Sequence, residues 1–252
     1  MALTKIGKEG ITGISNSSDA NAITIDSSER VGIGTSPNAK LDIKDDSNST
    51  QAILRGRSSD NFGILDFRNN AGDTVKGQVK SDASSNLILR AGPTNDALKI
   101  DTNGHITKPL QPAFSVHKSN ADQSNIAEGV AVTITFAGER YDQNSDFASN
   151  TFTAPVTGKY FFNLTVRLKQ VDDAVHYYYI LIKTSNINYG SIFDTRVFDT
   201  DSAFFTMQTS ILADMDANDT AYAVVLQEAS GVVQTDIHGD PSYTYFTGHL
   251  VC

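Results

Sequence analysis

The chain has 252 residues, of which 39% are hydrophobic and 19% charged, a composition typical of a folded globular protein rather than a disordered one. Its formal net charge of −9 disfavours a phosphate backbone as partner, so we expect no nucleic acid among its ligands. No apolar run approaches the roughly 20 residues of a membrane helix, and the single cysteine, Cys252, excludes an intrachain disulfide.

The N-terminal residues, MALTKIGKEGITG, lack the apolar run and small-residue cleavage site of a secretory leader. We therefore expect the protein to be made in the cytoplasm without a signal peptide and not to insert into a membrane. Residues 1–20 precede the first alternating apolar run.

The composition of the chain changes near residue 110. Of the aromatic residues only Phe62 and Phe67 precede residue 111. Residues 1–110 hold 13 basic and 13 acidic residues, whereas residues 111–252 hold 7 basic and 16 acidic ones. Two regions that differ this much in chemistry indicate two structural units, which we divide as residues 21–110 and 111–252.

The region 21–110 is built of very short apolar runs separated by turn residues. These runs are AITI (22–25), RVGIGT (30–35), KLDI (40–43), GILDF (63–67), NLILR (86–90) and ALKI (97–100). Short strands with almost no aromatic residues cannot bury a sufficient core in one chain. We therefore predict a stalk in which identical chains intertwine their strands and make the core together.

Two prolines in the segment ITKPLQPAF favour an extended junction at residues 106–114. Longer alternating runs follow it, and together they predict an all-β sandwich or jelly roll. The expected strands are 113–117, 131–136, 151–156, 158–169, 175–184, 191–198, 204–213, 220–228 and 242–251.

Two of these strands carry specific expectations. Residues 150–169 read as two strands joined by a Pro/Gly turn, and the face from Tyr160 to Leu168 in the second strand is expected to lie in the core. The run HYYYILI (176–182) is apolar on both faces. One face must meet the core, so the other indicates a subunit interface, to which we assign Tyr178 and Ile180.

The second region resembles the complement-subcomponent-q-like globular domain of the tumour-necrosis-factor-like jelly rolls. The resemblance rests on PAFSV (112–116), ITF…E.YD (134–142), FTAPVTGKYFFNLTV (152–166), SILADMDANDTAYAVV (210–225) and SYTYFTGHLV (242–251). It implies a ten-stranded jelly roll in each subunit of a homotrimer. Both termini would lie at the base and the binding loops at the far end.

The first region resembles fibre segments of bacteriophages, especially marine phages and cyanophages. MALTKIGKEGITGIS, AITIDSSERVGIGTSPNAKLDI and ALKIDTNGHITKPLQPAF carry this resemblance. It implies a virion fibre made in the host cytoplasm, in which an attachment segment at residues 1–20 joins other virion proteins. The terminal domain would then bind a glycan or protein on the host surface.

The far-end loops are expected at residues 118–130, 169–174, 198–203 and 229–241. Carboxylates gathered there around a threefold axis would repel one another unless a cation neutralises them. The alternative is a purely structural role, in which Asp is frequent in these loops because its side chain closes turns. The candidate receptor-binding residues are Gln170, Asp172, Asp173, Phe198, Asp199, Asp201, Asp236, His238 and Asp240. The candidate ligands for Ca²⁺ near the axis are Asp172, Asp173, Asp199 and Asp201.

Motifs of catalysis are absent from the sequence, since no H-E-x-x-H, G-x-S-x-G or phosphate-loop pattern occurs. We therefore expect no enzymatic activity. Three functions stay open: a receptor-binding tail or head fibre, a purely structural capsid decoration or head fibre with a trimerising terminal domain, and a polysaccharide depolymerase.

Overall fold

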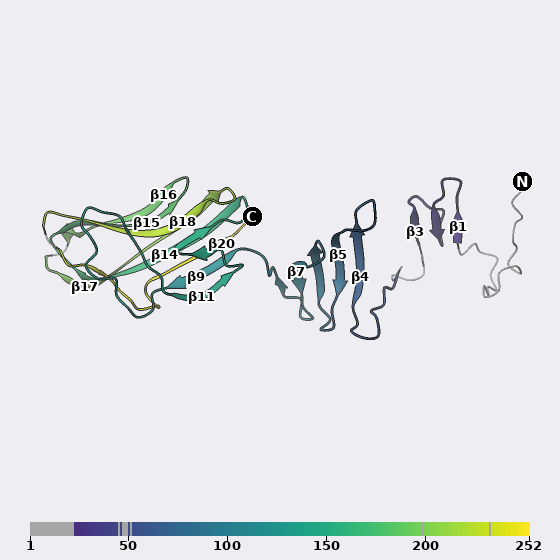
Figure 1. Cartoon of the computed structure of the whole chain (residues 1–252), viewed down its shortest axis with the longest axis horizontal. Coiled ribbons are helices and arrows are strands. Elements are labelled where there is room, and N and C mark those ends of the chain that lie inside the picture. The colour runs from purple at the N-terminus through teal and green to yellow at the C-terminus, as the bar shows by residue number, and fades with distance from the viewer. Residues whose placement is uncertain (1–22, 45, 47–49, 51, 198, 232) are drawn as a thin grey trace, which may run out of the picture. The chain divides into compact units, whose positions relative to one another are not determined.

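The computed structural model describes residues 23–44, 46, 50, 52–197, 199–231 and 233–252 (Figure 1). The chain divides into two compact units, Met1–Ile64 and Leu65–Cys252, with the division falling inside strand β4. None of the described helices has the length and apolar content needed to cross a membrane. The attachment segment predicted at 1–20 lies outside the described residues.

The first unit contains a three-stranded sheet in the order β1-β2-β3. Its strands are β1 (Ile23–Ile25), β2 (Val31–Ile33) and β3 (Leu41–Ile43). The turn after β1 is closed by Asp26, whose carboxylate accepts hydrogen bonds from the backbone N–H of Ser28 at 2.9 Å and from Nε of Arg30 at 2.7 Å. The Asp-led turn seen in the sequence is therefore a local hydrogen-bonded device.

The second unit begins with a five-stranded sheet in the order β4-β5-β6-β7-β8. Its strands are β4 (Gly63–Arg68), β5 (Val75–Ser81), β6 (Leu87–Ala91), β7 (Asn95–Ile100) and β8 (Ile106–Thr107). Tight turns with left-handed glycines at Gly72 (φ 78°) and Gly104 (φ 84°) join neighbouring strands. These strands thus pair within one chain, where we had expected strands intertwined between chains.

The rest of the second unit is a jelly roll of two sheets, which confirms the predicted all-β fold. One sheet has the order β12-β13-β18-β15-β16, with β10 beside β18; the other has the order β11-β9-β20-β14-β17, with β19 beside β14. The strands are β9 (Ala113–His117), β10 (Val132–Thr133), β11 (Gly138–Gln143), β12 (Phe147–Ala148), β13 (Thr151–Thr153), β14 (Gly158–Val171), β15 (Val175–Thr184), β16 (Asn188–Asp194), β17 (Ser202–Met215), β18 (Thr220–Ala229), β19 (Asp236–Ile237) and β20 (Tyr245–Leu250). A 3₁₀ turn, η2 (Thr195–Val197), follows β16.

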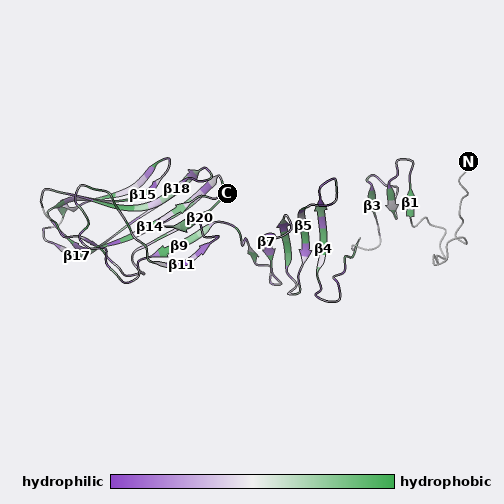
Figure 2. Ribbon diagram, viewed as in Figure 1, coloured by the Kyte–Doolittle hydropathy of each residue, from purple (hydrophilic) through white to green (hydrophobic). Residues whose placement is uncertain are grey.

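Strand β14 supplies the centre of the core. The alternating face predicted to be buried is fully buried, since the exposed fraction of each of these side chains is 0%. They are Tyr160, Phe162, Leu164, Val166 and Leu168. Around Phe162 lie the rings of Phe152 at 5.6 Å and Phe246 at 5.8 Å between centroids. The aromatic residues concentrated after residue 111 thus pack between the two sheets, and Figure 2 shows hydrophobic residues along these strands.

The two strands around Pro155 and Gly158 do not form the expected hairpin. Strand β13 pairs with β18 in one sheet, whereas β14 pairs with β17 and β20 in the other. The Pro/Gly segment is therefore a crossing between sheets. The error arose because a turn between two strands fixes only that the chain reverses, and here the partners of each strand come from distant residues.

The predicted subunit interface at Tyr178 and Ile180 is wrong for this chain. Both side chains are 0% exposed and belong to the core between the two sheets. The opposite face of β15, with Tyr177, Tyr179 and Leu181, is only partly buried. Because both faces of this strand are apolar, alternation alone could not tell which of them faces inward.

Strands β9 and β15 have the predicted bounds, while β14 and β17 extend beyond them. The sequence did not predict β11 (GERYDQ), which pairs with β9 although charged and polar residues dominate it. Its pairing carries a register shift between Glu139 and Tyr141, so its side chains do not alternate cleanly. Periodicity therefore gave no signal there.

We predict that Ile180→Ala lowers the free energy of unfolding by about 2–5 kcal/mol, because it leaves a cavity in a fully buried site. Ile192→Ala is the matched control, since Ile192 lies on the adjacent strand with 54% of its side chain exposed. We expect it to cost less than about 1 kcal/mol. Urea unfolding followed by circular dichroism measures both, and equal losses would show that Ile180 is not in the core.

Candidate functional site

The jelly roll has one end at which the chain enters and another that is distant from it. Ala113, the first residue of β9, pairs with His249 of β20, and the backbone N–H of Lys159 donates to the carbonyl of Cys252 at 2.7 Å. From there the 14 residues of β14 run for about 45 Å. The loop that follows Val171 therefore lies at the far end, as the sequence predicted.

The far end brings together segments from four parts of the chain. Val171 at the end of β14 pairs with Ser202 at the start of β17. Nearby, Leu168 pairs with Ile237, whose backbone also pairs with Gln123. Four loops were predicted to meet at this end, and all of them contribute residues next to the last residues of β14. These loops are 118–130, 169–174, 198–203 and 229–241.

Three carboxylates gather beside the Val171–Ser202 pair, and we call them the acidic cluster: Asp172, Asp173 and Asp201. Each can offer one oxygen such that the three oxygens lie within 4.8 Å of one another. The backbone N–H of Asp173 donates to Oδ1 of Asp201 at 3.0 Å, which ties the two loops together. Asp199, a further predicted ligand, does not belong to this group.

The turn that presents the acidic cluster is fixed to the core. Gln170 adopts a left-handed backbone with φ 54°, which turns the chain at the end of β14. Oδ1 of Asp172 accepts a hydrogen bond from the N–H of Ala174 at 2.8 Å, and the N–H of Asp172 donates to the buried hydroxyl of Tyr178 at 3.3 Å. That hydroxyl also bonds Thr235 at 2.7 Å. The buried Tyr178 therefore positions the acidic loop.

A pocket of about 500 Å³ opens beside the acidic cluster. It is lined by Gln170, Asp172, Asp201, Ser202, Ala203 and Gln234. Carboxylates, amides and one hydroxyl dominate this lining, so the pocket suits a ligand rich in hydrogen-bonding groups rather than an apolar one. We call it the far-end pocket.

The carboxylate oxygens of the acidic cluster are suitable ligands for a hard divalent cation. Ca²⁺ takes six to eight oxygen ligands, which include carboxylates, backbone carbonyls and water. Oδ1 of Asp172 and Oδ1 of Asp201 each accept a backbone hydrogen bond, and the second oxygen of each carboxylate can still serve as a ligand. Without a cation, three carboxylates this close repel one another, so binding would relieve a local electrostatic cost.

The other predicted site residues serve different purposes. Asp236 is 6% exposed and its Oδ1 accepts the N–H of Asn125 at 2.8 Å, so it holds a loop in place. Asp240 accepts the N–H of Ser242 at 2.8 Å and closes a turn. Phe198 lies outside the described residues. The far-end pocket therefore retains Gln170, Asp172 and Asp201 from the predicted set, and Asp173 adjoins them.

His238 belongs to a separate aromatic group that the sequence did not predict. The guanidinium of Arg167 lies between the rings of Phe204 and Tyr243, at 4.2 and 4.1 Å from their centroids. The ring of His238 lies 5.2 Å from that of Phe204 and 6.3 Å from that of Tyr243. Arg167 lies on the face of β14 opposite the buried core residues. Its ring partners are distant in sequence, so only the fold reveals this cation–π arrangement.

An ion pair stabilises the loops next to this aromatic group. Nζ of Lys169 donates to Oδ2 of Asp122 at 2.7 Å, and the N–H of Gly239 donates to Oδ1 of Asp122 at the same distance. The hydrogen bond from Lys169 is the largest cause that holds the pKa of Asp122 below its usual value. Asp122 is therefore charged in the fold and joins the loops at 118–130 and 229–241 to β14.

Comparisons with known proteins address the fold. No family model matches the chain, and no curated protein matches it either. Among solved structures, the globular domain of zebrafish complement 1qA protein is 17% identical with a TM-score of 0.41, covering 56% of this chain and 98% of that one. Murine APRIL at pH 8.5 is 8% identical with a TM-score of 0.41, covering 56% and 99%.

A third similar structure is the tumour necrosis factor Eiger of S. frugiperda, which is 8% identical with a TM-score of 0.41 and covers 56% of this chain and 94% of that one. Since these identities and TM-scores are low, the jelly-roll assignment rests on the strand order of this chain itself.

We predict that Ca²⁺ raises the melting temperature of the protein and that a chelator lowers it, because the ion neutralises the acidic cluster. At about 100 times the dissociation constant the stabilisation would be about 2.7 kcal/mol. Asp201→Asn should remove most of this response, whereas Asp199→Asn should keep it, since Asp199 lies outside the cluster. A wild-type melting temperature that neither Ca²⁺ nor chelator changes would contradict the site.

Proposed function

We propose that this protein is a homotrimeric viral fibre whose jelly roll binds a receptor on the host surface. The observation that carries the proposal is that the two termini of the jelly roll and the far-end pocket lie at its opposite ends. The chain enters and ends at one end, while the far-end pocket and the acidic cluster lie at the other, about 45 Å along β14. A domain tethered at its base thus presents a polar pocket away from its attachment.

The chemistry of the far-end pocket favours a host glycan as the receptor. Its amide and carboxylate groups, Gln170, Gln234, Asp172 and Asp201, can accept and donate the hydrogen bonds that sugar hydroxyls need. A Ca²⁺ ion on the acidic cluster would add a ligand position for hydroxyl oxygens. A host protein with polar side chains is the alternative receptor that the same pocket would serve.

The viral origin and the place of the protein in a virion are supported by the sequence of the first region. The segments AITIDSSERVGIGTSPNAKLDI and ALKIDTNGHITKPLQPAF resemble phage fibre segments. In this proposal the N-terminal residues attach the fibre to other virion proteins, and the protein acts without catalysing a reaction. The assembly is a homotrimer, in accord with the resemblance of the second region to complement-q-like domains.

We predict that the purified protein binds host cells and blocks adsorption of the virus. Asp201→Asn should weaken cell binding about tenfold or more, because it removes a charged lining residue of the far-end pocket. Asp214→Asn is the control of the same chemistry at the base, where Asp214 pairs with Lys159 at 2.8 Å, and it should bind as the wild type does.

Three outcomes separate this proposal from the other functions. Wild-type protein that does not bind cells, together with labelling that places it on the capsid, would replace receptor binding by a structural decoration role. Equal losses in both variants would contradict the far-end pocket as the binding site. Release of soluble reducing ends from host polysaccharide would show a depolymerase.

A further inference from the structure

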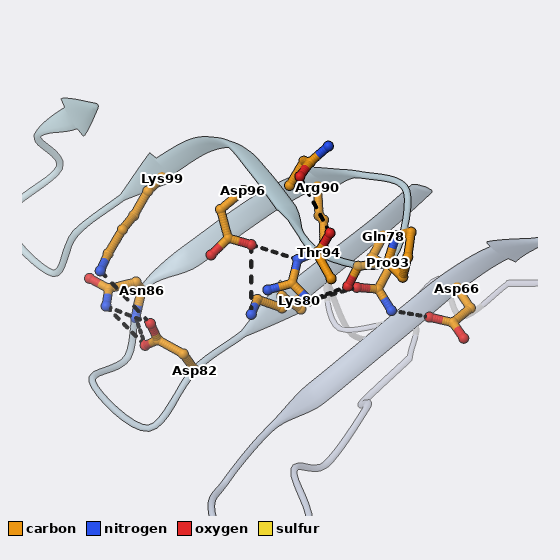
Figure 3. A network of polar contacts seen from close by, with 11 residues as sticks. Asp66, Gln78, Lys80, Asp82, Asn86, Arg90, Pro93, Thr94, Asp96 and Lys99 are labelled. Atoms are coloured by element: carbon orange, nitrogen blue, oxygen red, sulfur yellow. Dashed lines mark hydrogen bonds and ion pairs between the residues drawn. The ribbon is translucent and has the colours of Figure 1, made fainter. Parts of the chain in front are cut away.

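The sheet β4-β5-β6-β7-β8 has two faces of different chemistry. One face, which we call the polar face, carries a network of charged and amide side chains (Figure 3). Nε2 of Gln78 donates to Oδ1 of Asp66 at 2.7 Å, and Nε of Arg90 donates to Oδ1 of Asp96 at 2.6 Å. Nη1 of Arg90 also donates to Oε1 of Gln78 at 3.2 Å, so the network extends across β4 to β7.

The polar face is complete within a single chain. Two large apolar residues lie on this face. Ile88 is only 2% exposed and pairs with Lys80 on one side and Lys99 on the other, whereas Ile64, at the edge strand, is 45% exposed. The aliphatic stems of these lysines can cover Ile88 while their ammonium groups reach carboxylates, Asp96 at 3.8 Å and Asp82 at 4.0 Å. This face therefore needs no partner to pair the charges of its network or to cover Ile88.

The opposite face, which we call the apolar face, is not covered by the residues that the structure describes. Alternation places on it the residues whose neighbours in each strand point to the polar face. Its exposed members are Leu65 (48%), Phe67 (54%), Leu87 (46%), Leu89 (43%) and Ile106 (61%). Its partly buried members are Val75, Val79, Leu98 and Ile100.

The pairing register shows that the apolar face is continuous. Val79, Leu89 and Leu98 are paired in one row, and Leu87, Ile100 and Ile106 in the next. None of the residues that the described strands place on this face is charged. A charged or strongly polar partner would therefore leave its own groups unsatisfied there.

A single sheet layer with one uncovered apolar face is not a stable end state. Folded domains pair each apolar sheet face with a second layer. Four strands of five to seven residues and the two-residue β8 make a face of about 400 Å². Three such faces together approach the roughly 1,200–2,000 Å² that specific, stable interfaces bury.

We propose that the apolar face packs against the same face of two other copies of this chain, so that three complete sheets surround one shared core. The same face on another copy is uncharged and equally long, and the polar faces of all three would point outward. The number of copies rests on the proposed homotrimer. The packing differs from the predicted intertwined stalk, because each chain forms its own five-stranded sheet and the three sheets pack face to face.

Single cysteines introduced into Cys252→Ser protein test this arrangement by their rate of reaction with a maleimide. Leu89→Cys probes the apolar face, and Lys76→Cys probes an exposed position on the polar face of the same sheet. We expect Leu89→Cys to react at least tenfold more slowly than Lys76→Cys in native protein and equally fast in urea. Equal native rates would overturn the proposal.

A charge variant gives a second readout that does not depend on labelling. Phe67→Asp combined with Leu89→Asp should convert trimers to monomers in light scattering, or raise the rate of subunit exchange at least tenfold, whereas Lys76→Asp should do neither. Circular dichroism checks that the jelly roll stays folded. An unchanged mass and exchange rate in the double variant would also overturn the proposal.

The two measurements separate this inference from the proposed function. A trimeric wild type whose Leu89→Cys reacts freely would leave the homotrimer and the receptor-binding role intact and reject the shared core. A monomeric wild type would reject the homotrimer and the shared core together. Cell binding by the wild type, measured in parallel, reports on the far-end pocket alone.

Discussion

Much of the second unit depends on one constraint: a β-strand can bury every second side chain while its backbone pairs with neighbours on both sides. Strand β14 satisfies it over 14 residues, with Tyr160, Phe162, Leu164, Val166 and Leu168 fully enclosed and β17 and β20 hydrogen-bonded to either edge. The length of this strand sets the distance between the base and the far end. It thereby fixes how far the acidic cluster lies from the chain's entry.

The same constraint explains why the second unit is built in two ways. In the jelly roll, large aromatic residues from two sheets fill the space between them, so the core closes within one chain. In the sheet from β4 to β8, the apolar side chains are few, mostly aliphatic and largely on one face. Such a sheet satisfies its backbone hydrogen bonds alone but not its apolar surface, so assembly is the physical route to a core.

Part of the candidate site could be predicted from the sequence, because placing its loops requires only a few features of the chain. Loops rich in Asp, one long strand, and the resemblance to complement-q-like domains, which implies that both termini lie at one end, were enough to place Asp172, Asp173 and Asp201 at the far end. The sequence could not exclude Asp199, because cluster membership depends on the pairing of Val171 with Ser202 and on the path of the loop before it. The ring partners of Arg167 were equally invisible, since Phe204 and Tyr243 meet it only through the fold.

By itself, the sequence determined the all-β class, the bounds of long strands such as β15, and the buried face of β14, because alternation of polar and apolar residues reports directly on burial. Only the tertiary structure decided that Tyr178 and Ile180 face inward and that the strands around Pro155 lie in different sheets. It also decided that β4 to β8 pair with one another in a single chain. The physical reason is that partners in a sheet are chosen by hydrogen bonds between residues distant in the chain. A local pattern records that a face is buried but not what buries it.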